Sequence, residues 1–299
     1  MENLITASVP EHLCSLLQRE RTGEVLMVTS SGVYLQFEEC VLLLCDAAWG
    51  VLPIGIGVDD FEQVIPRLHL QQGQQVTLSA EFILFQSGKI RLIPQKTQQE
   101  KPRNAAPERE TIRQAAKELA SLHKPRGFSA LVLPLVLGIA LHDAAMQNPY
   151  CDYACQYLQE LIVAFENRDN DRIRGCTEKL LGLGSGLTPS ADDVLLGMLY
   201  VFREFPHECA EQTGLFQKTI ARLCDQRTNR ISAAYLKAIM DGAPFGRMAY
   251  VFRSLCGEER LDIQKLTRIG SNSGSEMLLG MLLALRICGY DISRMEELQ

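Results

Sequence analysis

Residues 182–197 read Gly-Leu-Gly-Ser-Gly-Leu-Thr-Pro-Ser-Ala-Asp-Asp-Val-Leu-Leu-Gly. Three glycines at alternating positions let a backbone approach another group closely. Pro189, which follows the loop, fits the first position of a helix. If Ser190 is instead the N-cap residue, Ser190 and Asp193 fit a capping box. The stretch therefore predicts a Gly/Ser loop that opens a helix over Pro189–Phe205.

The same design recurs near the end of the chain. Residues 273–282 align without gaps to residues 190–199; six residues are identical, and Glu276 takes the place of Asp193. A Gly-Ser loop precedes each of the two segments. Glycine is unfavourable by about 1 kcal/mol inside a helix. Because Gly197 and Gly280 both lie in mid-helix, we expect these two helices to pack closely against each other.

Helical periodicity extends over the rest of the C-terminal two thirds. The other expected helices are Glu108–His123, Phe128–Gln147, Tyr150–Glu166, Asp171–Leu181, Leu215–Asp241, Pro244–Cys256, Asp262–Ile269 and Ser273–Cys288. Gly242 and Gly289 are candidate C-caps. The polar stretch Thr228-Asn-Arg-Ile-Ser232 interrupts one of these helices, and we interpret it as an exposed helix face.

The first third has short runs rich in valine, isoleucine, leucine and phenylalanine, separated by glycine, serine or aspartate. The expected strands are Val25–Thr29, Val33–Phe37, Val41–Cys45, Val76–Leu78, Phe82–Phe85 and Ile90–Ile93. The glycine-rich stretch 50–57 is expected to be a loop. We therefore predict an α+β protein. A β-rich sheet or small barrel over residues 1–95 is joined by a polar, proline-containing linker, 96–107, to an all-helical domain over 108–299.

The composition limits the class of protein. Of 299 residues, 46% are hydrophobic and 22% charged, as in globular proteins. A net charge of −6 without a Lys/Arg cluster argues against a nucleic-acid partner. Ten cysteines without a Cys-x-x-Cys pair, and five scattered histidines, predict reduced thiols and neither a metal site nor a bound cofactor.

Two further features bear on location. The N-terminal residues lack the basic and apolar regions of a signal peptide. The most apolar run, Ala130–Leu141, is shorter than the roughly 20 residues that a membrane span needs. We therefore expect a cytoplasmic protein without a membrane partner.

The two loops suggest a binding site for an anion. A helix N-terminus exposes unpaired N–H groups and a partial positive charge, and nearby hydroxyl groups add donors. Asp192, Asp193 and Glu276 would repel a phosphate, so they cap the helices, orient a group or hold a cation. The alternative is that both loops are capped helix starts that pack two helices side by side.

His142-Asp143 is a poor dyad, because neighbours on a helix do not face each other. Asp169-Asn-Asp171 is interpreted as a turn and N-cap.

The sequence at 182–193 resembles the hallmark of the AllH family. Gly270-Ser-Asn-Ser-Gly274 resembles that family's second hallmark, and the stretch from Thr228 to Gly242 resembles a third. The resemblance covers the helical half. It differs at Ser271-Asn272, where the family often has His-Thr, so an imidazole is lacking here as an acid, base or anion donor.

The resemblance implies a subunit of oxamate carbamoyltransferase, which interconverts oxalurate plus phosphate and oxamate plus carbamoyl phosphate in anaerobic allantoin breakdown. It implies FdrA-like (AllF-type) and AllG-type subunits as partners. On this basis we expect Asp192, Asp193 and Ser185 to be catalytic. The expected substrate-binding residues are Gly184, Ser185, Gly186, Thr188, Ser190, Arg230, Ser271, Asn272, Ser273 and Gly274.

Two alternatives stay open. A non-catalytic scaffold or regulatory subunit would bind an anionic metabolite through the same loops. A stand-alone phosphate-binding enzyme is the other, because the first loop also resembles the phosphate loop of the small-molecule kinases that include galactokinase and mevalonate kinase. The order of glycine and serine differs from that loop.

Overall fold

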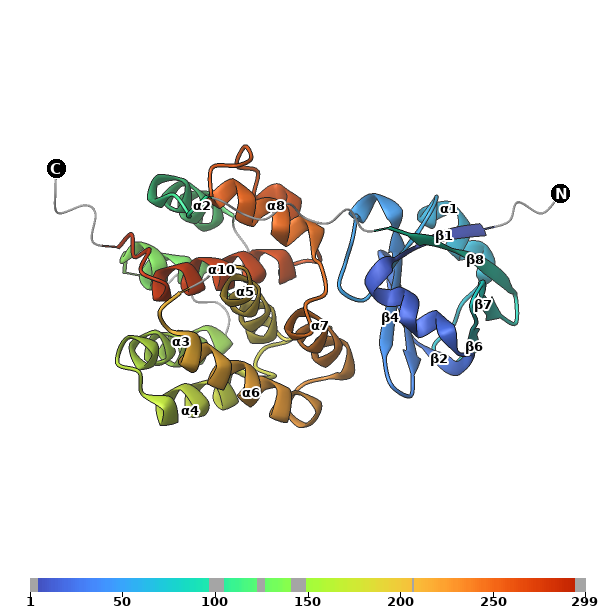
Figure 1. The fold of residues 1–299 in the computed structure, drawn as a ribbon, viewed down its shortest axis with the longest axis horizontal. Helices are drawn as coiled ribbons and strands as arrows, with labels where there is room; N and C mark the ends of the chain where they lie inside the picture. Colours follow the sequence, from blue (N-terminus) through green and yellow to red (C-terminus); the bar gives the residue numbers. More distant parts are fainter. Residues whose placement is uncertain (1–4, 97–104, 123–126, 141–148, 206, 294–299) are drawn as a thin grey trace. The chain divides into compact units, whose positions relative to one another are not determined.

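The computed structural model describes residues 5–96, 105–122, 127–140, 149–205 and 207–293. Within them the protein is α+β, with a closed β-barrel followed by a helical region, as the sequence predicts (Figure 1). Contacts divide the chain into two compact units, Met1–Pro102 with Ala243–Gly246 and Arg103–Gly242 with Arg247–Gln299.

The barrel has the strand order β1-β5-β4-β3-β2-β6-β7-β8. Its strands are β1 Ile5–Pro10, β2 Arg21–Val28, β3 Gly32–Phe37, β4 Val41–Asp46, β5 Gly55–Val58, β6 Gln75–Leu78, β7 Phe82–Phe85 and β8 Gly88–Gln95. Parallel pairing of β1 with β8 closes it, with Ile5 opposite Ile90. Closure leaves no edge strand unpaired.

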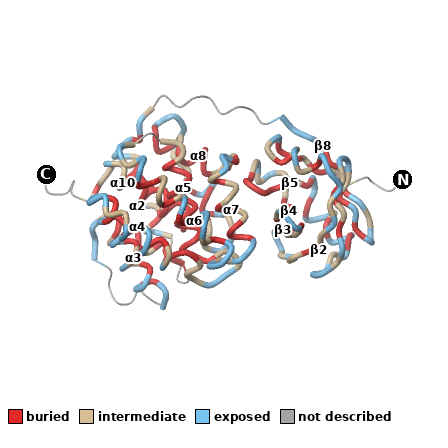
Figure 2. The backbone as a smooth tube through the Cα atoms, turned by 60° about the horizontal axis from the view of Figure 1, so that its bottom comes forward, coloured by how far each residue is buried: buried red, intermediate tan, exposed pale blue. Residues whose placement is uncertain are grey.

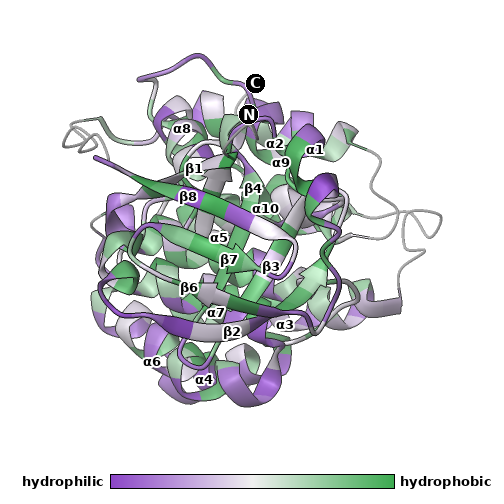
Figure 3. Ribbon diagram, turned by 90° about the vertical axis from the view of Figure 1, so that its right-hand side faces the viewer, coloured by the Kyte–Doolittle hydropathy of each residue, from purple (hydrophilic) through white to green (hydrophobic). Residues whose placement is uncertain are grey.

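Alternating side chains fill the barrel. In β8, Ile90 and Leu92 are buried while Lys89 and Arg91 are exposed, so one face of the strand points into the core. Figure 3 shows hydrophobic and hydrophilic segments along β8. The short elements between strands are η1 Glu11–Gln18, η2 Ala47–Trp49, α1 Phe61–Val64 and η3 Ile65–Leu68. Leu13, Leu17 and Phe61 from these elements join the same apolar core.

The sequence prediction missed two strands, β1 and β5. The expectation that residues 50–57 form a loop is wrong at its C-terminal end, where β5 begins at Gly55. β5 pairs in parallel with β4 and antiparallel with β1. A Cβ on Gly57 would lie 2.9 Å from the Cα of Ala47, so glycine serves close backbone approach here and does not mark a turn.

The helical region contains most of the expected helices, with ends shifted by a few residues. Its helices are α2 Arg109–Ser121, α3 Pro149–Glu166, α4 Asn170–Leu180, α5 Ser190–Glu204, α6 Ala210–Arg227, α7 Arg230–Met240, α8 Gly246–Leu255, α9 Gln264–Thr267 and α10 Ser273–Ile287. Asp169 is the N-cap of α4, as predicted. Gly242 and Gly289 follow α7 and α10 with positive φ, which confirms them as helix-ending residues.

The expected helix Phe128–Gln147 is wrong over its described part. A 3₁₀ turn, η4 Ser129–Leu131, is followed by a π-helical turn, η5 Leu133–Leu137, which ends at Gly138 with a φ of +70°. Pro134 lacks an N–H and its ring clashes with the carbonyl one turn earlier, so an α-helix cannot run through it. His142 and Asp143 lie outside the described residues.

The expected single helix Leu215–Asp241 is also wrong, because it is two helices. α6 ends at Arg227, and α7 begins at Arg230 after an extended Asn229. The side chain of Asn229 accepts hydrogen bonds from the amides of Ile231 and Ser232, which makes it the N-cap of α7.

α5 and α10 form the centre of the helical region, and both are buried along nearly their whole length (Figure 2). A Cβ on Gly197 would lie 2.0 Å from the carbonyl oxygen of Met277, and one on Gly280 would lie 1.9 Å from that of Val194. The two backbones are in contact at these glycines. This confirms the prediction that the mid-helix glycines serve close packing.

Two general observations complete the fold. No helix in the described part of the chain combines the length and hydropathy needed to cross a membrane. All ten cysteines are free thiols.

Candidate functional site

The first Gly/Ser loop, residues 182–188, has a conformation that requires its glycines. Gly182, Gly184 and Gly186 have φ values of +82°, +119° and +118°. A Cβ on Gly182 would lie 1.9 Å from the carbonyl oxygen of Arg227, and one on Gly184 would lie 2.6 Å from the amide of Ser190. Both strain and lack of space therefore exclude other residues at these two positions.

α5 begins at Ser190, and its N-cap is Pro189, which has no side chain to cap it. Neither predicted register is correct, since proline is not the first helical residue and Ser190 makes no capping hydrogen bond. The loop backbone replaces the capping side chain: the amide of Ala191 donates to the carbonyl of Leu183 at 2.9 Å. The loop and the helix start are thus one hydrogen-bonded unit.

The loop also presents free backbone donors. Within the described part of the chain, the amides of residues 184–188 donate to no protein acceptor. Ser185 and Gly186 are exposed, whereas Gly184, Leu187 and Thr188 are half-buried. Successive free amides in a loop before a helix N-terminus are a suitable arrangement for an anionic group.

Asp192 is buried, and both oxygens of its carboxylate accept hydrogen bonds. Oδ1 accepts the amide of Gly182 at 2.7 Å, and Oδ2 accepts the hydroxyl of Ser232 at 2.7 Å and that of Thr228. Burial raises the pKa of Asp192, while these three hydrogen bonds act in the opposite direction. The carboxylate therefore ties the loop to the junction between α6 and α7.

Asp193 lies where the two Gly/Ser loops meet. Its Oδ2 accepts the hydroxyl of Thr188 at 2.8 Å, and the hydroxyl oxygens of Thr188 and Ser273 lie 3.0 Å apart. The pKa of Asp193 is raised well above its usual value, mainly because the carboxyl group is buried and secondly because the charge of Glu276 is close to it. A carboxyl group with such a pKa retains its proton at higher pH than an ordinary aspartate, as a general acid requires.

The second loop, residues 270–272, leads into α10, and like the first loop it depends on glycine conformation and on close backbone approach. Gly270 has a φ of +57°, and a Cβ on Gly274 would lie 1.9 Å from the carbonyl oxygen of Leu266. Glu276, the counterpart of Asp193, is buried in the first turn and accepts the amide of Phe128 at 3.1 Å. The two acidic residues are therefore held from different sides.

A comparison with known families matches this part of the chain. Residues 180–285 match the model of the family described as oxamate carbamoyltransferase subunit AllH. The match confirms the resemblance to AllH over these residues, and it contains both loops, helices α5 to α9 and most of α10. The family description is that of a subunit, and hence of a component of a multi-subunit enzyme. No solved structure matches the chain.

The AllH-matched region brings together some of the predicted site residues. Thr188, Asp193 and Ser273 are in direct contact. Ser185, Gly186 and Ser271 lie exposed on the loops, and Ser190 and Gly274 are buried at the helix starts. Arg230 is exposed at the first position of α7.

The sequence analysis missed three polar residues at the α6–α7 junction. Thr228 and Ser232 bind Asp192, and the amide nitrogen of the Asn229 side chain donates to the carbonyl of Leu187 at 2.8 Å. The interpretation of this stretch as only an exposed helix face is therefore wrong. The interruption of an apolar helix by Thr-Asn-Arg-Ile-Ser was the available signal.

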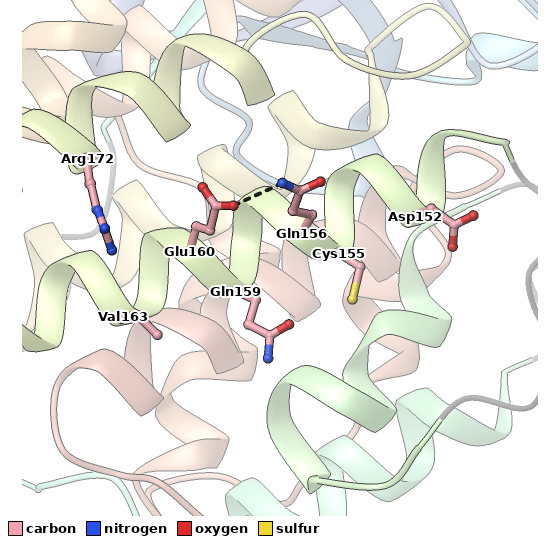
Figure 4. A pocket seen from close by; sticks show the side chains of 7 residues that line it. All are labelled: Asp152, Cys155, Gln156, Gln159, Glu160, Val163 and Arg172. Carbon is pink, nitrogen blue, oxygen red and sulfur yellow. Dashed lines mark hydrogen bonds between the residues drawn. The ribbon is translucent and has the colours of Figure 1, made fainter.

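A pocket in the helical region lies apart from the predicted site residues. Figure 4 shows a hollow of about 550 Å³ along α3, lined by Asp152, Cys155, Gln156, Gln159, Glu160, Val163 and Arg172. It contains none of the predicted site residues. Among the described residues, no group of three or more His, Cys, Asp or Glu has the arrangement of a metal site.

Proposed function

We propose that this chain is a subunit of an oxamate carbamoyltransferase-like complex. The complex interconverts oxamate plus carbamoyl phosphate and oxalurate plus phosphate in anaerobic allantoin breakdown, with FdrA-like and AllG-type chains as the other subunits. The family match over residues 180–285 supports the assignment to such a complex.

The free amides of residues 184–188 are the observation that carries the proposal for the site. In the transfer, the amide nitrogen of oxamate bonds to the carbamoyl carbon and loses a proton, the bond from that carbon to the phosphate oxygen breaks, and the departing phosphate takes up the proton. Both substrates are anions, and the tetrahedral intermediate carries an additional negative charge. Preorganised N–H donors stabilise such charge.

Several of the predicted residues are assigned roles in this proposal. The amides of Gly184, Ser185 and Gly186 and the hydroxyl of Ser185 bind phosphate or the oxyanion. Asp193, with its raised pKa, holds a proton beside Thr188 and Ser273. On the second loop, Ser271 and Asn272 offer a hydroxyl and an amide where the family often has His-Thr.

Two residues have roles that differ from those first expected. All the bonds that Asp192 makes are to groups of the protein, which suits a positioning role rather than a catalytic one. Arg230 is exposed and suits an attraction for anions from solution.

Reconstitution tests the proposal. The complex is assembled from FdrA-like and AllG-type partners with and without this chain, and phosphate formation from carbamoyl phosphate and oxamate is measured. We expect phosphate formation to require this chain. Equal rates in its absence would contradict the proposal.

The same preparation separates the alternatives. A scaffold subunit is required for assembly, but substitutions in its loops leave the rate unchanged. A kinase-type enzyme binds ATP–Mg²⁺ without partners, and a thermal shift of the isolated chain with ATP–Mg²⁺ would identify it.

A further inference from the structure

We propose that Asn229 is a positioning residue that holds the first Gly/Ser loop in its ligand-binding shape, with Asp192 as the second anchor. The binding role of the loop rests on the proposed function, whereas the anchoring is tested on the isolated chain. Neither the family match nor the sequence pattern assigns a role to Asn229.

The side chain of Asn229 uses both of its ends. Its oxygen caps α7 by accepting the amides of Ile231 and Ser232, both at 3.0 Å. Its nitrogen donates to the carbonyl of Leu187 at 2.8 Å. One planar amide therefore links the start of α7 to the C-terminal end of the loop.

Asp192 holds the other end of the loop. It accepts the amide of Gly182 and, from the opposite side, the hydroxyls of Thr228 and Ser232. The loop is thus attached to the α6–α7 junction at Gly182 and at Leu187. Of the free amides of residues 184–188, those of residues 184–187 lie at or between these attachments.

Such a loop depends on its attachments. Three glycines with positive φ give the unattached segment a large conformational freedom, and donors that move bind an anion more weakly than donors already in place. Loss of one attachment should therefore weaken ligand binding while α5 and α7 remain folded.

A substitution can separate the role of the Asn229 side-chain oxygen from that of its nitrogen. Asn229→Asp retains the oxygen that caps α7, since aspartate is as good an N-cap as asparagine, but it removes the donor to Leu187. It also places a carboxylate oxygen against a carbonyl oxygen. The matched control is Asp169→Asn at the N-cap of α4, which makes the reverse exchange at a cap whose side chain hydrogen-bonds and ion-pairs with Arg172.

Limited proteolysis of the isolated chain measures the anchoring, with cleavage sites mapped by mass spectrometry. We expect cleavage within residues 183–188 to become about fivefold faster in Asn229→Asp, the effect of losing one hydrogen bond, and to stay unchanged in Asp169→Asn. Far-ultraviolet circular dichroism should show equal helix content in all three proteins. Equal cleavage rates in Asn229→Asp and the wild type would overturn the proposal.

Steady-state kinetics of the reconstituted complex measure the consequence for the ligand. In Asn229→Asp we expect the KM for carbamoyl phosphate to rise about fivefold or more with a smaller change in kcat, because binding and not chemistry is weakened. Faster cleavage with an unchanged KM would show that the loop does not bind carbamoyl phosphate, which would contradict the proposed function. The anchoring of the loop by Asn229 would still be supported.

Discussion

The hydroxyl oxygens of Thr188 and Ser273 lie 3.0 Å apart, although the two residues are separated by 85 positions in the chain. Ser273 begins one of the two similar segments, and Thr188 lies two positions before the other. The internal repeat is therefore a structural pair, in which the loops that open α5 and α10 meet above the contact between Gly197 and Gly280.

The first prediction concerns this hydroxyl pair. In a double-mutant cycle with Thr188→Ala and Ser273→Ala, measured by urea denaturation, we expect a coupling energy of about 1 kcal/mol, typical of one buried hydrogen bond. The pair Thr188→Ala and Ser121→Ala is the control, because Ser121 bonds within its own helix. Additive effects in the first cycle would mean that the hydroxyls do not interact.

The second prediction tests the helix contact at the glycines. Gly280→Ala places a Cβ against the carbonyl of Val194 and should lower the free energy of unfolding by about 3 kcal/mol, the upper range for overpacking. Gly175→Ala, inside α4 with no atom within 4 Å of the new Cβ, should raise it by up to about 1 kcal/mol. Equal effects of the two substitutions in urea denaturation would refute the close contact.

The third prediction concerns pH. The pKa of Asp193 is raised in the folded protein, so the folded state binds a proton more tightly than the unfolded state, and stability falls as pH rises above about 4. Asp193→Asn removes this loss. Its thermal midpoint relative to the wild type, followed by circular dichroism at the helix band, should therefore increase with pH.

The control for this titration is Asp171→Asn, since the side chain of Asp171 is 92% exposed. Its difference from the wild type should be nearly constant over the same pH range. A constant difference for Asp193→Asn would show that Asp193 titrates as an ordinary aspartate.

The fourth prediction concerns Asp192. Asp192→Ala leaves the amide of Gly182 and the hydroxyls of Thr228 and Ser232 without their acceptor. We expect a loss of about 3 kcal/mol or more in the free energy of unfolding, because hydrogen bonds to charged groups contribute about 1.5–3 kcal/mol each. Asp171→Ala, which breaks an exposed ion pair, should lose less than about 1 kcal/mol. Similar losses would argue against Asp192 as an anchor.

Much of the fold follows from local sequence patterns. Strands with alternating apolar residues and helices with regular periodicity were predictable, as was the contact between Gly197 and Gly280. β1 and β5 were not, because their pairing is long-range and β5 carries two glycines. The α-helix expected through Pro134 failed because apolar periodicity was given more weight than the missing N–H of proline.

The site could be predicted only where the residues are close in sequence. The loop at 182–188 and the acidic pair were visible as motifs. The contribution of Thr228, Asn229 and Ser232 was not, since their partners lie about 40 positions earlier in the chain. Polar residues inside an apolar helix can form an exposed face or bind another segment of the chain, and only the tertiary structure decides between these two interpretations.

The most direct test of the central claim is the kcat/KM for carbamoyl phosphate in a complex reconstituted with Ser185→Ala. Assembly is checked by size-exclusion chromatography, and Ser121→Ala serves as the matched control. The account predicts a fall of about tenfold or more for Ser185→Ala with normal assembly, because a donor to the developing charge is removed. An unchanged kcat/KM in a normally assembled complex would contradict the account.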